Sequence, residues 1–291
     1  MKWGMMSSLF PRQRGRNKEV KSKAAVYPYL VWMIIFIIVP TALVVVFAFT
    51  DKGGTFTLQN LQEVGQYSNI FLRSIWLGAV ATVVSLVVGY PAAYIISRHS
   101  VSRQNTLIML IMLPMWMNFL LRTYAWMTLL EDSGFINRAL MACGFPSVHM
   151  INTQGAVVLG MVYNYIPYMI LPVYSVLTKI DPSVIEAAED LGADRRTVFL
   201  RVTLPLSMPG VISGVTMVFV PSVSTFIISK MLGGGSNLLI GDLIDMQFLG
   251  SAYNPNLGSA ISLVLMVLIL ICMGIMNQFD ENGAAEGGMM V

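Results

Sequence analysis

The chain has 291 residues, a formal net charge of +3, 56% hydrophobic residues and only 11% charged residues. Soluble domains contain about 25% charged residues, so this composition excludes a soluble globular protein and indicates an integral membrane protein. In lipid, only helices and closed barrels satisfy every backbone group, and the long unbroken apolar runs favour helices over the alternating strands of a barrel. The sequence therefore predicts an all-α, polytopic membrane protein.

The first 25 residues form a basic segment with seven Lys and Arg residues. Such segments stay on the cytoplasmic side and are attracted to anionic lipid, so we expect contact with membrane lipid and no binding of nucleic acid. The apolar run that follows is too long for a signal peptide and lacks a small-residue cleavage site. It predicts an uncleaved membrane anchor.

Six apolar runs reach the length of roughly 20 residues that a helix needs to cross the hydrocarbon core. They cover residues 26–49, 71–96, 107–127, 155–177, 211–231 and 257–276, and together they define a transmembrane domain at residues 26–276. The fifth run is the least hydrophobic, because it contains Pro221, Ser222, Ser224 and Thr225. The acidic, Gly-rich tail at residues 277–291 is expected to be disordered.

The loops between the runs differ in basic charge. Lys and Arg occur between the second and third runs and again between the fourth and fifth, at Arg98, Arg103, Lys179, Arg195, Arg196 and Arg201. The alternate loops carry little more than Lys52 and Arg138. The positive-inside rule therefore predicts that the N-terminus and both of these basic loops lie in the cytoplasm. Six spans then return the C-terminus to the cytoplasm as well.

The loop between the fourth and fifth runs has the signals of two short helices joined at a corner. Asp181 and Pro182 suit an N-cap and the first position of a helix. Gly192 suits the left-handed residue just past a helix end. Asp194 then caps a second helix, which we expect to stop near Thr203 because a proline two residues later lacks an N–H.

The first of these helices carries Glu186, Ala187 and Ala188. The alanines are small enough to let another protein approach the backbone closely, and the glutamate offers a carboxylate to a basic or N–H-rich surface. One interpretation is therefore a docking segment for a partner at residues 178–210. The other is an ordinary capped loop helix without a partner.

No segment of the sequence has the Gly-rich loop ending in Gly-Lys-Ser or Gly-Lys-Thr that cradles nucleotide phosphates. Residues 233–236 are rich in Gly but lack the lysine. No nucleophile and base form a recognisable set, so we expect no enzyme activity and no cofactor in this chain, and any ATPase must be a separate chain. Cys143, Cys272, His99 and His149 lack metal-ligand spacing, and we expect no metal site.

The order Glu186-Ala187-Ala188, then Gly192, Val202 and Leu204-Pro205, resembles the EAA loop of binding-protein-dependent ABC importer permeases. In that family Ile is commoner at the position of Val202. Further segments, at residues 121–126, 163–168, 204–210 and 233–241, are similar to the spermidine/putrescine branch of the family and to its PotB-type subunits in particular. The resemblance covers about residues 26–276.

This resemblance implies a type I importer permease of MetI-like architecture in a bacterial inner membrane. It implies a coupling loop for an ATPase, formed by Glu186, Ala187, Ala188, Gly192, Leu204 and Pro205. It also implies a PotC-like second permease subunit, a dimer of PotA-like subunits that binds ATP and Mg, and an extracytoplasmic PotD-like polyamine-binding protein.

A polyamine carries several ammonium groups, which carboxylates and aromatic faces attract. Candidates for the outer half of a substrate path are Trp116, Tyr124, Trp126, Tyr163, Tyr165, Tyr168, Asp242 and Asp245. The two aspartates are three residues apart and would share a helix face. The alternatives are an interfacial aromatic belt and a solvated loop helix.

Arg122 is a cation within the third run. Because an unpaired charge in a membrane span is costly, we expect Arg122 to be structural and to pair with Glu131, Asp132 or an acidic residue on another span.

These features favour the permease subunit of an ABC importer for spermidine or putrescine. A nearer alternative is an importer permease for another small solute, such as an amino acid derivative, thiamine, or an iron or anion ligand. A more distant alternative is a membrane scaffold or passive channel.

Overall fold

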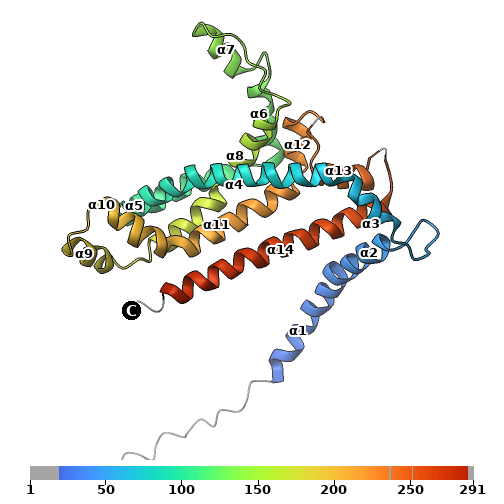
Figure 1. Ribbon diagram of the computed structural model, residues 1–291, viewed down its shortest axis with the longest axis horizontal. Coiled ribbons are helices and arrows are strands. Elements are labelled where there is room, and N and C mark those ends of the chain that lie inside the picture. The colour runs from blue at the N-terminus through green and yellow to red at the C-terminus, as the bar shows by residue number, and fades with distance from the viewer. Residues whose placement is uncertain (1–19, 236, 251, 288–291) are drawn as a thin grey trace, which may run out of the picture. The chain divides into compact units, whose positions relative to one another are not determined.

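The computed structural model describes residues 20–235, 237–250 and 252–287 (Figure 1). Apart from one antiparallel bridge between Thr50 and Phe56, the regular structure in these residues is helical. The all-α prediction is confirmed. The chain divides into two units, residues 1–46 and residues 47–291, which are described separately.

The first unit contains most of the first predicted span, up to residue 46. Helix α1 (Val20–Met33) leads through a π-helical turn, η1 (Ile34–Ile38), into α2 (Val39–Ala48), and the stretch Tyr27–Ala48 is long and apolar enough to cross a membrane. The π turn precedes Pro40, whose missing N–H it accommodates by shifting the hydrogen-bond register. Residues 1–19 of the predicted basic segment lie outside the described residues.

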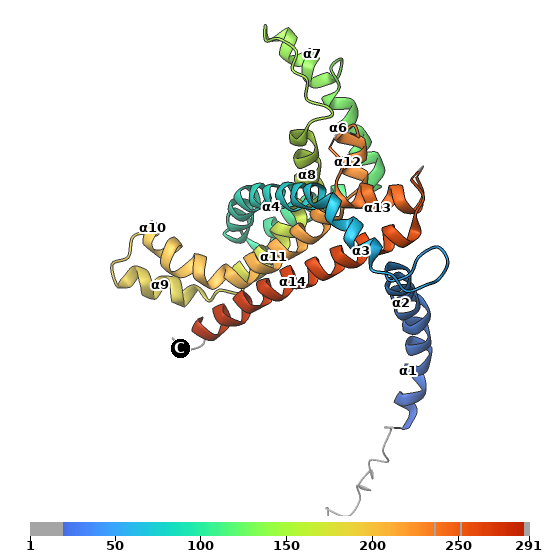
Figure 2. The same cartoon turned by 45° about the vertical axis from the view of Figure 1, so that its right-hand side comes forward.

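Three long helices form the main core of the second unit: α4 (Ser68–Ser97), α8 (Gln154–Leu177) and α11 (Leu204–Ser224). Each packs against the other two, and the views show them side by side (Figures 1 and 2). Small residues allow close approach, as is usual between membrane helices. A Cβ on Gly210 would lie 2.9 Å from the carbonyl oxygen of Pro172, and one on Gly214 would lie 3.1 Å from that of Met169.

A second hydrophobic cluster lies around the last helix, α14 (Pro255–Gly287), which packs against α3 (Gln59–Val64), α11 and α13 (Ile240–Phe248). The short turn η2 (Gly65–Tyr67) joins α3 to α4. The predicted second, fourth and sixth spans correspond to α4, α8 and the first part of α14. Residues 277–287, for which the sequence predicts disorder, continue α14 as a helix. Residues 288–291 lie outside the described part.

The predicted third span, residues 107–127, is wrong as one straight helix. Helix α5 (Val101–Met112) and the 3₁₀ turn η3 (Leu113–Trp116) are bent by 88° against α6 (Phe119–Leu130) and α7 (Phe135–Ala142). Asn118 starts the new helix, because its side-chain oxygen accepts a 2.8 Å hydrogen bond from the Leu120 N–H. The Asn118 cap was the sequence signal for this break.

The predicted fifth span, residues 211–231, has the wrong bounds. The apolar helical stretch runs from Arg195 to Ser224, and the chain breaks at Thr225 and Phe226 before the separate short helix α12 (Ile227–Leu232). Among the described residues, five helices are long and apolar enough to cross a membrane, and the bent pair brings the number to six.

The close contact of α11 with α8 makes Gly210 a sensitive position. We expect Gly210→Val to lower the free energy of unfolding by about 1–3 kcal/mol, because the new side chain meets the backbone of α8. Thermal unfolding in detergent measures this change. Gly274→Val on α14 is the control, since a Cβ there meets nothing within 4 Å. Equal midpoints of thermal unfolding for the two variants would contradict the prediction.

Candidate functional site

The most distinctive surface of the second unit is the helical elbow between α8 and α11, residues 178–203. Its first arm is α9 (Pro182–Asp190), which starts as predicted: the Asp181 carboxylate accepts a 2.9 Å hydrogen bond from the Ser183 N–H. The corner also forms as predicted, because Gly192 has a φ of 86°. A side chain with a Cβ is strained in this left-handed region, so glycine suits the corner.

The second arm is α10 (Arg195–Val198), and Asp194 caps it through a 3.2 Å hydrogen bond from the Thr197 N–H. The expected stop near Thr203 is wrong. A π-helical turn, η4 (Phe199–Thr203), joins α10 to α11 without a break, and the Leu204 N–H bonds to the Phe199 carbonyl. The π turn shifts the hydrogen-bond register by one residue just before Pro205, which lacks an N–H, and so lets the helix continue past the proline.

Both caps are carboxylates with a lowered pKa. For Asp181 the main cause is the hydrogen bond from the Ser183 backbone, and for Asp194 it is the bond with the Thr197 side chain. A carboxyl group whose pKa is lowered by folding stabilises the folded form above its unfolded pKa and loses this effect as the pH falls. Both caps are therefore in place at neutral pH.

Much of α9 and the corner after it is open to solvent. Glu186, Ala187 and Gly192 are exposed and Ala188 is half-buried. Sequence reasoning missed Leu191, which is 90% exposed at the corner and adds an apolar contact point. Leu204 and Pro205 lie instead at the start of α11, where they determine how the second arm joins its span.

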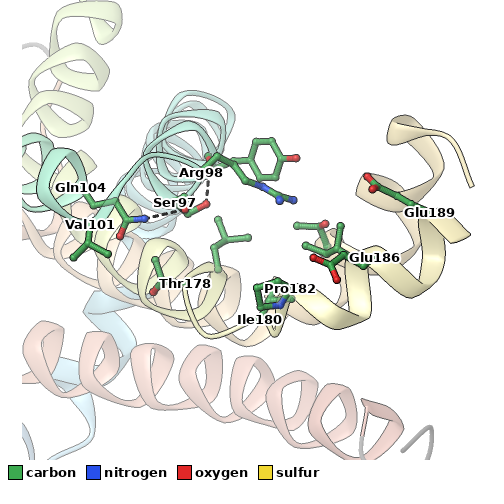
Figure 3. A pocket seen from close by; sticks show the side chains of 13 residues that line it. Ser97, Arg98, Val101, Gln104, Thr178, Ile180, Pro182, Glu186 and Glu189 are labelled. Atoms are coloured by element: carbon green, nitrogen blue, oxygen red, sulfur yellow. Dashed lines mark hydrogen bonds between the residues drawn. The ribbon is translucent and has the colours of Figure 1, made fainter.

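A cavity of about 480 Å³ lies between α9 and the sharp corner that joins α4 to α5 (Figure 3). Glu186 and Glu189 come from α9 on one side, and Arg98 and Gln104 come from the α4–α5 corner on the other. The guanidinium of Arg98 lies over the Tyr94 ring, 5.1 Å from its centroid. The cavity therefore separates the carboxylates of the elbow from the nearest basic side chain of the corner.

The candidate aromatic residues are only partly brought together. Trp126 of α6 and Tyr163 of α8 form an edge-to-face pair with ring centroids 5.3 Å apart. Tyr165 is buried and its ring lies 6.4 Å from that of Tyr168 on the same helix. Trp116 and Tyr124 are 74% and 53% exposed, as lipid-facing or interfacial residues are.

The two candidate aspartates each have a partner within the chain. Asp242 accepts a 2.8 Å hydrogen bond from the Leu239 N–H and so caps its own helix, α13. Asp245 forms a 3.0 Å ion pair with Lys230. Burial is the main cause of the raised pKa of Asp242. Both line a small cavity of about 200 Å³, but they are not a free pair of carboxylates.

The expected ion pair of Arg122 with Glu131 or Asp132 is wrong. Arg122 is 8% exposed, and its Nε and Nη1 atoms have no hydrogen-bond partner in the described part of the chain. Its guanidinium lies 5.9 Å from the centroid of the Phe119 ring. Asp132 instead contacts His149 at 2.9 Å. Nine residues of helix separate Arg122 from Glu131, a rise of roughly 13 Å, which explains why they do not meet.

Comparison with known proteins identifies the fold and the family. The model of the family described as "Binding-protein-dependent transport system inner membrane component" matches residues 89–281. The chain belongs to this family. It is therefore a multi-pass inner-membrane protein and the permease subunit of an ABC transporter.

Curated relatives include the spermidine/putrescine transport system permease protein PotB of Haemophilus influenzae, which is 36% identical over 82% of this chain and 87% of that protein. PotB of Escherichia coli is 33% identical over 82% of this chain and 90% of its own length. A second E. coli protein, the inner membrane ABC transporter permease YdcU, is 29% identical over 78% of this chain and 77% of its length.

Among solved structures, a bacterial ABC transporter involved in the import of the acidic polysaccharide alginate matches with a TM-score of 0.75 and 19% identity. It covers 90% of this permease and 96% of that chain. The MetNI methionine ABC transporter, in an inward-facing conformation, matches with a TM-score of 0.57 and 16% identity over 76% of this chain and 98% of its own. These matches show an importer-permease fold.

The N-cap of α10 gives a direct test of the elbow's local structure. We expect Asp194→Ala to speed amide hydrogen exchange in the peptide around residues 194–203, because the first turn of α10 loses its acceptor. Asp194→Asn is the matched control, since its side-chain oxygen caps the helix equally well. Hydrogen exchange with mass spectrometry at neutral pH compares the variants, and equal exchange in both would refute the prediction.

Proposed function

We propose that this permease belongs to an importer of spermidine and putrescine and that its elbow, with Glu186 on α9, couples transport to a separate ATPase. The observation that carries the coupling proposal is the exposure of α9 to solvent. This helix offers a carboxylate and small side chains at the end of two helical arms that continue into core spans. The PotB relatives support the polyamine cargo.

The orientation proposed for the membrane is a cytoplasmic elbow and cytoplasmic termini. In support, the α4–α5 corner and the elbow, both rich in Lys and Arg, line one cavity. The loops predicted to lie outside contact each other through hydrogen bonds. The Asn152 N–H donates to the Leu232 carbonyl at 2.9 Å, and the Asn237 amide donates to the Asn152 carbonyl at 3.1 Å.

The proposed complex contains a PotC-like permease, a PotA-like ATPase dimer and a PotD-like binding protein. ATP and Mg would reside on the ATPase, and this chain would hold no ATPase site and no cofactor. A related fold occurs in the alginate transporter solved with its substrate-bound periplasmic protein, which supports a docking partner on the outer side.

The proposed mechanism is mechanical. Closure of the ATPase dimer would displace α9, and the displacement would tilt the spans and change access from the outer to the inner side. The ATPase can drive this change only if its contacts with the elbow differ in strength between the two states. An exposed, charged surface on a helix that is anchored at both ends suits such a contact.

The coupling role predicts a loss of transport from changes in the elbow. Glu186→Lys reverses the charge on α9, and Gly192→Val strains the corner where φ is 86°. We expect each to leave membrane insertion intact and to reduce ATP-driven uptake by roughly tenfold, within the usual range of coupling energies. Uptake into proteoliposomes measures the effect.

Gly144→Val is the matched control for the corner, because Gly144 also has a left-handed backbone, with a φ of 84°, and lies in a loop proposed to be outside. Normal uptake by both elbow variants would rule out the coupling role. A chain that copurifies with no ATPase would instead favour a scaffold or passive channel.

The cargo is tested by uptake of labelled spermidine, which putrescine should compete and neutral or acidic solutes should not. Trp126→Leu removes one ring of the Trp126–Tyr163 pair. If that pair attracts the ammonium groups, KM should rise roughly 5- to 30-fold, which corresponds to a loss of about 1–2 kcal/mol of binding free energy. Trp76→Leu is the control, since Trp76 is an exposed tryptophan on α4 outside the candidate path. If the complex took up a different solute and no spermidine, the cargo would belong to the class of that solute.

A further inference from the structure

The end of α4 that faces the elbow is tied to both of its arms. The first tie is the side chain of Gln104, in the first turns of α5. Its amide nitrogen donates to the carbonyl oxygens of Ser97 and His99, at 3.0 and 2.7 Å. These two carbonyls lie at the end of α4 and in the corner after it, where helical partners are missing.

The amide oxygen of Gln104 completes this tie. It accepts a 2.9 Å hydrogen bond from the hydroxyl of Tyr174, which lies on α8 just before that helix ends at Leu177. The chain then passes directly into the first arm of the elbow. Gln104 therefore joins the end of α4, the corner and the root of α9 through one side chain.

The second tie is the ring of Phe199, at the start of the π turn in the second arm. Its centroid lies 6.0 Å from the Tyr90 ring and 5.2 Å from the Tyr94 ring, both edge to face. The two tyrosines belong to successive turns of α4. The hydroxyl of Tyr90 also makes a buried 2.8 Å hydrogen bond with Ser207, in the first turn of α11. Edge-to-face pairs stabilise by more than their buried area alone.

The first arm of the elbow, α9, lies across a cavity from the end of α4. The cavity of about 480 Å³ separates α9 from the α4–α5 corner, and Figure 3 shows the side chains of Glu186 and Arg98 on its opposite sides. A movement of α9 therefore reaches α4 through the roots of the two arms, and these are the places where Gln104 and Phe199 make their contacts.

We infer that the end of α4 beside the elbow receives the movement of the coupling elbow, and that Tyr174 with Gln104 on one arm and Phe199 on the other are the positioning residues that transmit it. The inference rests on the coupling role proposed above. It adds a second element, the α4–α5 corner, which moves as one body with the end of α8.

Tyr174→Phe removes a single hydroxyl and leaves both hydrogen bonds of Gln104 to the corner in place. Phe199→Leu keeps an apolar side chain and removes the edge-to-face contacts. Tyr253→Phe is the matched control, because Tyr253 is 66% exposed in the loop before α14. The full complex with its ATPase and binding protein is reconstituted in proteoliposomes, and ATP hydrolysis and uptake of labelled spermidine are measured together.

We expect Tyr174→Phe and Phe199→Leu to retain the ATPase on copurification, yet to lower uptake per ATP hydrolysed severalfold, with a larger loss in the double variant. A merely structural role would reduce hydrolysis and uptake in proportion and lower the yield of the complex. That proportional loss, or an unchanged ratio in the double variant, would overturn the inference.

A second measurement does not depend on the cargo. Spin labels at the exposed positions Ser102 and Ser175, with Cys143 and Cys272 replaced by Ser, report the distance between the corner and the end of α8. We expect the same narrow distance with and without ATP, and a broader one in Tyr174→Phe. A distance that changes with ATP in the otherwise unaltered chain would overturn the inference. If no ATPase copurifies with the unaltered chain, the proposed coupling role fails and the inference falls with it.

Discussion

The continuous helical path from α10 through η4 into α11 is the feature on which the arrangement of the elbow depends. A membrane span must satisfy its own backbone groups, and a proline near its end removes one donor. The π turn accommodates this loss, because it shifts the hydrogen-bond register just before Pro205. As a result, the second arm of the elbow and the fifth span are one helical rod. A displacement at Arg195, the start of α10, would therefore act on α11 without a non-helical joint between them.

The same solution occurs at the first span, where the π turn η1 is followed by Val39 and Pro40 as η4 is followed by Leu204 and Pro205. In both places the Pro is the second residue after the turn. Propensity rules treat such a proline as a helix stop, and that rule produced the wrong end near Thr203. The rule fails because it assumes a fixed register, whereas a π turn absorbs the missing donor by shifting the register.

The sequence predicted the parts of the fold that depend on composition and on capping. Apolar runs located α4, α8 and α14, and Asp181, Gly192 and Asp194 gave the caps and corner of the elbow. The sequence failed to predict where one helix ends and the next begins, and which of several possible partners a side chain contacts. Hydropathy alone merged α5 with α6, although Asn118 marks the break, and it could not show that Asp132 bonds to His149 rather than to Arg122. The pairing of Gln104 with Tyr174, 70 residues apart, has no local signal at all.

Charge constrains what a path through this chain could attract. Asp242 caps the N-terminus of α13 through Oδ2 and Asp245 pairs with Lys230, so the two aspartates are not a free pair of carboxylates. Arg122 adds a buried positive charge, and two of its guanidinium nitrogens have no hydrogen-bond partner among the described residues. For a polycationic cargo, attraction within this subunit would then come from aromatic faces such as those of Trp126 and Tyr163. Such faces hold ammonium groups weakly, by about 0.5–2 kcal/mol each, and weak holding favours release as well as entry. Fixed carboxylates on a path would bind a polycation more tightly and slow its departure.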